Sequence, residues 1–236
     1  MNFKPILKSF APTPLHATFA EKLRSGVAGG LAIFLLAWAL HFLPQPQFPL
    51  LLLGSMAASA VLLYAVPHSP LAQPWNLVGG HLFSALCGWL SMAYISDPLL
   101  AAGVAVGAAI FLMYVLNCLH PPGAATALTL VLGASQFQQM GLLWTALIVI
   151  ANAGISLLLA LLLNNALPRR RYPQMTTPHA PAPRSGKDVI IIPEQEDLEW
   201  VLSHQDSVLD ISIEDLTEVY WLAQQRAQAR YDSAAR

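Results

Sequence analysis

One long stretch of this chain is almost free of charge, and this restricts what the chain can fold into. Between Ser25 and Pro168 the only residue of Asp, Glu, Lys or Arg type is Asp97. Over the whole chain 56% of residues are hydrophobic and 11% are charged, against roughly 25% charged in ordinary globular proteins. In lipid the backbone must satisfy its own hydrogen bonds, which a helix does. The sequence therefore predicts an all-α, polytopic transmembrane helix bundle with water-facing ends.

Composition divides the chain into four parts. We expect a cytoplasmic leader over residues 1–24, a membrane domain over 25–168, a basic and proline-rich linker over 169–186 and an acidic tail over 187–236. The leader lacks the apolar core and cleavage site of a signal peptide. The tail has eleven acidic and four basic residues, a net charge of −7. A sequence typical of a helix start at 212–215 predicts a small, mainly helical cytoplasmic tail.

The membrane domain contains six apolar segments, at 26–43, 50–66, 76–95, 99–119, 120–133 and 140–163, with a polar turn predicted at 134–139. The segment 120–133 is too short to cross a hydrocarbon core of about 30 Å, and 50–66 is barely long enough. Basic residues precede the first segment and follow the last, so both termini are expected in the cytoplasm. The number of crossings must then be even, which six spans satisfy and four spans with two partial segments also satisfy.

A helix break is predicted at His120-Pro121-Pro122. Proline lacks the N–H and its ring clashes one turn back, so two prolines cannot continue a helix, although they suit the start of a new one. The residues that follow, from Gly123 to Ala127, are small and let another backbone or a ligand come close. Irregular backbone at membrane depth is tolerated where it is buried in protein or lines a polar cavity. The break therefore indicates either a ligand site or a tight packing corner without a ligand.

The sequence also contains a short internal repeat. Residues 57–60, Ala-Ala-Ser-Ala, and residues 124–127, Ala-Ala-Thr-Ala, are near copies that lie 67 positions apart. The same offset places the first segment on the fourth and the third on the sixth, which predicts two units of three segments each. If all six segments cross, the second unit is inverted, and inverted-repeat transporters bind their ligands between the units. The two short helices would then form the site.

The polar groups in this region favour a small monovalent anion over other ligands. Carboxylate ligands for a divalent cation are missing and the histidines lack the spacing of a metal site, so no metal or other cofactor is expected. Helix N-terminal N–H groups and Ser, Thr, Asn and His donors can hold an anion. A histidine at position 120 could also couple transport to protons, or could simply fix the break by a hydrogen bond. The candidate substrate-binding residues are Ser55, Ser59, Asn76, His81, Asn117, His120, Pro121, Pro122, Gly123 and Thr126.

Three motifs resemble the HPP family of integral membrane proteins. They are the stretch at His120-Pro121-Pro122, the segment Gly54–Ala65 and the segment Ser69–His81, and the resemblance covers about residues 20–172. Members of the plant and cyanobacterial branch of that family are described as nitrite transporters. The family usually has a second glycine where this chain has Ala124, which removes some backbone freedom at the expected helix start.

Two functions follow as hypotheses. The first is a membrane transporter or channel for a small inorganic anion, with nitrite as the substrate that the resemblance implies. The second is a membrane scaffold or sensor that acts through its acidic tail. Motifs of nucleophilic and metalloprotease enzymes are lacking, so no catalytic residue is expected. The expected location is the cell membrane, the inner membrane in a bacterium, with the lipid bilayer, a small anion and a homo-oligomer as partners and no nucleic acid.

Overall fold

The computed structural model describes residues 17–43, 51–167, 170–174, 216–217 and 220–221 of the 236-residue chain. Most of this part is helical, as predicted, and it contains α2 (Phe19–His41), α3 (Ser55–Ala65), η1 (Pro70–Ala72), α4 (Pro74–Tyr94), α5 (Pro98–Val115), α6 (Pro121–Leu132) and α7 (Ala134–Ala166). The chain separates into two compact units, residues 20–179 and the two chain ends. The predicted linker and tail lie almost entirely outside the described residues, apart from 170–174 and the helical pairs 216–217 and 220–221.

Four of these helices are long and apolar enough to cross a membrane, namely α2, α4, α5 and α7. At 1.5 Å per residue, α3 and α6 are only about 16 and 18 Å long, roughly half of a hydrocarbon core. By length and composition, the described helices thus give four candidate spans and two short segments, which agrees with the second of the two predicted arrangements. The expectation that residues 50–66 form one continuous segment is wrong, because α3 begins only at Ser55.

Proline fixes the starts of three helices. Pro74, Pro98 and Pro121 each occupy the first position of α4, α5 and α6, where their missing N–H costs nothing. Asp97, the lone charge of the membrane segments, caps α5 by accepting a hydrogen bond from the Leu100 N–H at 2.7 Å. Asn76, a candidate site residue, lies in the first turn of α4, which begins at Pro74.

Helix α7 contains a break at Gly141. This residue has φ 81° and ψ 163°, a conformation that glycine adopts without a steric penalty. The hydroxyl of Thr145 donates to the Gly141 carbonyl at 2.9 Å, which satisfies one of the groups near the break. The predicted polar turn at 134–139 is wrong: these residues form the helical first part of α7, and the chain bends after them.

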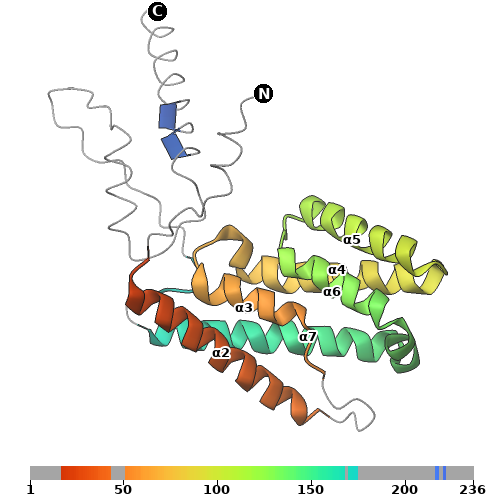
Figure 1. Ribbon diagram of the computed structural model, residues 1–236, viewed down its shortest axis with the longest axis horizontal. Helices are drawn as coiled ribbons and strands as arrows, with labels where there is room; N and C mark the ends of the chain where they lie inside the picture. Colours follow the sequence, from red (N-terminus) through yellow and green to blue (C-terminus); the bar gives the residue numbers. More distant parts are fainter. Residues whose placement is uncertain (1–16, 44–50, 168–169, 175–215, 218–219, 222–236) are drawn as a thin grey trace, which may run out of the picture. The chain divides into compact units, whose positions relative to one another are not determined.

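The tightest packing lies between α4 and α6, where glycine replaces side chains. A methyl group added at Gly123 would lie 2.6 Å from the Gly80 carbonyl oxygen, and one added at Gly88 would lie 2.6 Å from the Ala127 carbonyl oxygen. Contacts this short are possible only without a Cβ, as the small residues of the sequence led us to expect. In Figure 1, α4 and α6 lie beside α5 on one side of the bundle, with α3 and α7 on the other.

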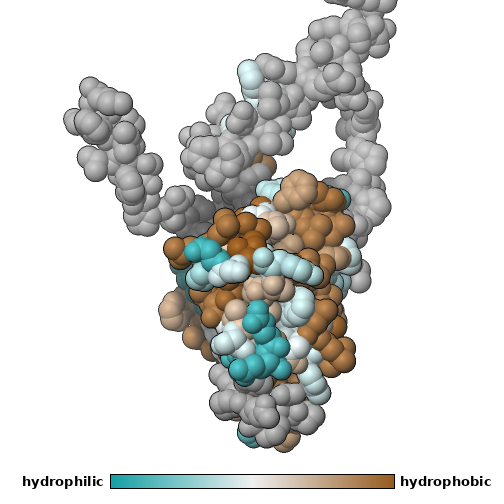
Figure 2. Space-filling view, turned by 90° about the vertical axis from the view of Figure 1, so that its right-hand side faces the viewer, coloured by the Kyte–Doolittle hydropathy of each residue, from teal (hydrophilic) through white to brown (hydrophobic). Residues whose placement is uncertain are grey.

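The outer surfaces of residues 20–179 suit a lipid environment. Figure 2 views the end at which α4 turns into α5 and α6 meets α7: hydrophilic residues gather across the middle of this face and hydrophobic residues cover its flanks. Large apolar side chains such as Phe34, Phe111 and Leu143 are exposed on α2, α5 and α7. A soluble protein rarely exposes so many large apolar groups, whereas a bilayer covers them. Cys87 and Cys118 are buried free thiols.

The order of the helices is long, short, long, repeated once. Helices α2, α3 and α4 form the first set and α5, α6 and α7 the second. This order agrees with the 67-residue spacing of the repeat, and the inverted relation between the two sets stays a prediction.

Candidate polar site between the short helices

The predicted helix break is present and is made of five non-helical residues. Helix α5 ends at Val115, and Asn117 follows in the left-handed region with φ 52°. His120 is extended, with φ −141° and ψ 99°, and it caps the start of α6 at Pro121. Residues before proline favour this extended conformation. The two prolines thus place the His120 side chain at the start of α6 and turn it into the protein, where it is completely buried.

Five polar side chains meet between α3, α4 and α6, and we call them the polar cluster: Ser55, Ser59, His81, His120 and Thr126. Each is at most 3% exposed. The Ser59 hydroxyl lies 2.9 Å from Nε2 of His81 and 3.0 Å from Nε2 of His120. The Thr126 hydroxyl lies 2.7 Å from Nδ1 of His81 and 2.7 Å from the Ser55 hydroxyl. Half of the ten predicted site residues therefore form one hydrogen-bonded group.

The pairing within the cluster shows how the two short helices run. Ser55 of α3 bonds to Thr126 of α6, and Ser59 bonds to His120 just before α6. Residue numbers increase along α3 in the direction in which they decrease along α6, so the first turns of α3 and α6 lie side by side and antiparallel. The positive ends of both helices are therefore close to the cluster.

The remaining five predicted residues have other positions. The Asn76 side chain donates to the Leu119 carbonyl at 2.8 Å and supports the break. Asn117 and Pro121 are exposed, while Pro122 and Gly123 are buried against α4. The N–H of Gly123 donates to the His120 carbonyl at 2.7 Å, and neither proline has an N–H. The Gly123 N–H is therefore used within the break in this conformation, and ligand binding by helix N-terminal N–H groups stays a prediction.

Two groups escaped the sequence analysis. The His120 ring donates through Nδ1 to the Leu71 carbonyl of η1 at 2.8 Å, a backbone contact that no residue pattern signals. Asn152 of α7 is fully buried; its amide donates to the Leu51 carbonyl and its oxygen accepts from the Leu53 N–H. Asparagine in the middle of an apolar span is costly unless paired, so its position in the sequence could have signalled it.

A buried ion pair lies apart from the polar cluster, where the chain leaves α7. Arg170 pairs with Glu21 of α2, and it also donates to the Ser25 hydroxyl at 2.8 Å and to the Asn164 side chain at 3.3 Å. The side chain of Arg170 is 4% exposed. Arg170 belongs to the basic run that follows the last apolar segment, and it ties the end of α7 to α2, whereas Arg171 is exposed.

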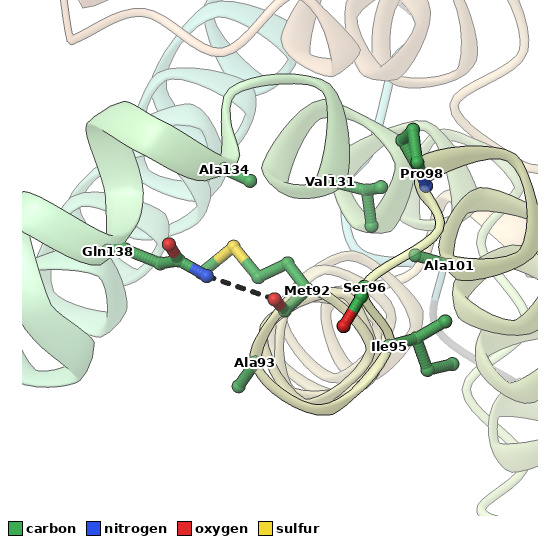
Figure 3. A pocket seen from close by; sticks show the side chains of 9 residues that line it. All are labelled: Met92, Ala93, Ile95, Ser96, Pro98, Ala101, Val131, Ala134 and Gln138. Carbon is green, nitrogen blue, oxygen red and sulfur yellow. Dashed lines mark hydrogen bonds between the residues drawn. The ribbon is translucent and has the colours of Figure 1, made fainter.

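Two hollows flank the junction between α6 and α7. One, of about 360 Å³, lies between the end of α4 and the start of α5, and there Gln138 donates to the Met92 carbonyl at 2.9 Å (Figure 3). The other, of about 370 Å³, is lined by Leu53, just before α3, and by Thr129, one turn after Thr126. The second hollow therefore opens beside the Ser55 end of the polar cluster.

Metal chemistry has no support in the described part of the chain. No group of three His, Cys, Asp or Glu side chains is placed to hold a metal ion among the residues with described positions. The two histidine rings of the cluster lie 5.0 Å apart between centroids, and each directs its Nε2 at the same serine hydroxyl. What the cluster offers is a set of uncharged donors and acceptors with two protonatable rings.

The fold and the cluster define a multi-pass helical membrane protein with a buried polar centre. The chain belongs to the HPP family, because the family model described as "HPP, transmembrane region" matches residues 14–173.

Two curated proteins of Dictyostelium discoideum, each named only as a transmembrane protein, are similar to the chain. One is 44% identical over 126 residues, covering 52% of this chain and 44% of the relative. The other is 37% identical over 165 residues, covering 68% and 53%. The chain thus spans about half the length of these relatives. No solved structure matches it.

Proposed function

We propose that this protein is a membrane transporter or channel for a small monovalent inorganic anion, with nitrite as the first substrate to test. The observation that carries the proposal is the polar cluster, five buried and mutually hydrogen-bonded polar side chains at two antiparallel short helices in a largely apolar bundle. Polar groups inside a membrane domain are costly and mark substrate pathways. Nitrite is the first substrate to test because members of the plant and cyanobacterial branch of the HPP family are described as nitrite transporters.

The charge balance favours an anion of single charge. From residue 26 to 167 the chain has one formal charge, on Asp97, and that carboxylate is bonded to the start of α5. A cation would need carboxylate oxygens near the cluster. Ser, Thr and His side chains and the positive ends of two short helices instead suit a small anion without a full countercharge.

Transport requires the bundle to open. The cluster is shielded from solvent on all sides, so this conformation is a closed one in which neither face reaches the site. The hollow beside Leu53 and Thr129 lies close to the Ser55 end. We therefore expect the ligand to enter by separation of the α3 start from the α6–α7 junction.

The experiment is nitrite uptake into liposomes that contain the purified protein, with nitrate, formate and chloride as competitors. His120→Gln should reduce saturable uptake by at least about tenfold, since it removes a cluster group that accounts for more than one hydrogen bond. His41→Gln is the matched control, because His41 is exposed at the end of α2. If folded wild-type protein moves none of these anions, the transporter proposal fails and the scaffold or sensor function becomes the better explanation.

A further inference from the structure

The polar cluster forms a chain of hydrogen bonds with a carbonyl at one end. The Ser59 hydroxyl also lies 3.3 Å from the Ser55 carbonyl oxygen, a longer separation than the 3.0 Å to Nε2 of His120, so we assign its one hydrogen to the histidine. The order is Ser55, Thr126, His81, Ser59, His120 and the backbone oxygen of Leu71, with separations from 2.7 to 3.0 Å. Four elements contribute to it, namely α3, α4, α6 and η1. Such a chain has two possible directions, and the donors and acceptors decide between them.

The Leu71 carbonyl fixes the direction of every bond. A carbonyl only accepts, so His120 carries its proton on Nδ1. In the neutral ring Nε2 then accepts, and it accepts from the Ser59 hydroxyl. That hydroxyl has no second hydrogen, so it accepts in turn from Nε2–H of His81. Nδ1 of His81 accordingly accepts from Thr126, and Thr126 accepts from Ser55. All five donors point toward Leu71.

This order leaves the neutral cluster without a donor for an anion. Each hydroxyl and ring N–H of the five side chains is already used within the chain. Other ionisable groups do not join it: Tyr64 of α3, Cys87 and Tyr94 of α4, Cys118 before α6, and Asp97 and Tyr114 of α5 have no hydrogen bond to the cluster among the described contacts. A free donor for the anion must therefore come from an added proton, which also brings a positive charge.

A proton that arrives at Ser55 provides both. The Ser55 oxygen binds it and passes its original hydrogen to Thr126; Thr126 passes one to Nδ1 of His81; Nε2 of His81 passes one to Ser59; and Ser59 passes one to Nε2 of His120. One proton enters and none leaves, so His120 becomes a cation that donates to Leu71 and to Ser59. The new O–H of Ser55 has no partner within the chain and can donate to an anion; Leu53, two residues before Ser55, lines the 370 Å³ hollow.

We propose that the anion crosses together with a proton, which the polar cluster accepts at Ser55 and holds at His120 while Ser55 binds the anion. This inference rests on the proposed anion transport and adds its coupling ion. It predicts a symporter that moves one proton with each monovalent anion, so that the complete cargo is neutral and crosses an apolar bundle without an uncompensated charge.

The test uses liposomes with tracer nitrite and a pH-sensitive dye inside, compared with protein-free liposomes that report passage through lipid alone. An acidic exterior should drive nitrite to accumulate inside above its outside concentration, and each nitrite should bring one proton. Exchange of nitrite against nitrite at equal concentrations and equal pH reports transport without a gradient. If exchange proceeds while nitrite uptake from the acidic exterior brings in no protons, the coupling is wrong and anion transport stands. If exchange also fails, the proposed function itself is wrong.

Variants separate a proton chain from a structural role. Thr126→Val keeps the shape of the side chain and removes the hydroxyl that joins Ser55 to His81, so proton and nitrite uptake should fall together by at least about tenfold. Thr126→Ser retains the hydroxyl and should restore both. Ser84→Ala is the control, because Ser84 is a buried serine of α4 whose hydroxyl makes one hydrogen bond among the described contacts, to the Met113 sulfur at 3.7 Å, and none to the cluster. Proton uptake that persists in folded Thr126→Val would overturn the chain.

Discussion

The close contact between α4 and α6 makes Gly88→Ala a sharp test of how packing holds the site. Gly88 lies in α4, outside the polar cluster. A methyl group there would lie 2.6 Å from the carbonyl oxygen of Ala127, 2.9 Å from its Cα and 3.1 Å from its carbonyl carbon. All three are backbone atoms of a helix, so no flexible side chain can move aside. The two helices must separate instead.

The size of that separation follows from the contact distances. Ordinary contacts begin near 3.4 Å, so the oxygen must retreat by about 0.8 Å from its 2.6 Å position. Ala127 is the neighbour of Thr126, whose hydroxyl lies 2.7 Å from Nδ1 of His81 in α4. If the shift falls along this bond, the distance grows to about 3.5 Å, beyond useful hydrogen bonding. Overpacking of this kind costs about 1–3 kcal/mol of unfolding free energy.

Thermal unfolding in detergent and nitrite uptake measure the two consequences. Gly88→Ala should unfold at a lower temperature and lose most of its nitrite uptake, although it changes no side chain of the polar cluster. Gly103→Ala is the matched control, since a methyl group on that exposed position of α5 would meet no described atom within 4 Å. Equal stability and equal uptake in the two variants would refute the argument that glycine contacts set the geometry of the cluster.

Three further predictions concern single side chains. Ser59→Ala leaves two buried ring nitrogens without a partner and should cost about 2–4 kcal/mol in detergent unfolding, against about 1 kcal/mol or less for Ser84→Ala; similar losses would argue against the cluster. Arg170→Gln should cost about 3 kcal/mol because Glu21 loses its buried partner, while the exposed Arg171→Gln should unfold like wild type; a matching loss in both would speak against the ion pair. Burial, and then the charge of Arg170, lower the pKa of His68 below 6.5, with Glu21 opposing. The unfolded chain then binds more protons just below pH 6.5, so the free energy of unfolding is complete above that pH and falls on acidification. When unfolding is measured across a pH series, the free energy of His68→Gln should fall less steeply below pH 6.5 than that of the wild type. An equal fall in both proteins would exclude His68 as a source of the pH dependence.

Much of the architecture follows from local chemistry that the sequence displays directly. Apolar runs of span length predict α2, α4, α5 and α7, and paired prolines predict the break before α6. The prediction of secondary structure fails where a local sequence is compatible with both a turn and a helix, or where a distant residue decides the outcome. Residues 134–139 are polar enough for a turn and also form a helix, and only the positive φ of Gly141 shows where the chain bends. The start of α3 is displaced because Asn152, about 100 residues away, satisfies the backbone of Leu51 and Leu53.

The sequence by itself determined a helical membrane protein with two short helices and a small set of polar residues within it. The reason is that a chain in lipid must satisfy its backbone hydrogen bonds internally, which an apolar, uncharged segment does as a helix. Only the tertiary structure decided which polar residues act together. Ser55, Ser59, His81 and Thr126 meet His120, whereas Asn76 and Asn117 do not join them. The cluster forms because α4 and α6 pack closely, and this packing depends on glycines of one helix lying against the backbone of the other. The direction of the hydrogen bonds depends on a single carbonyl, that of Leu71, and an amino-acid pattern does not encode where a carbonyl points.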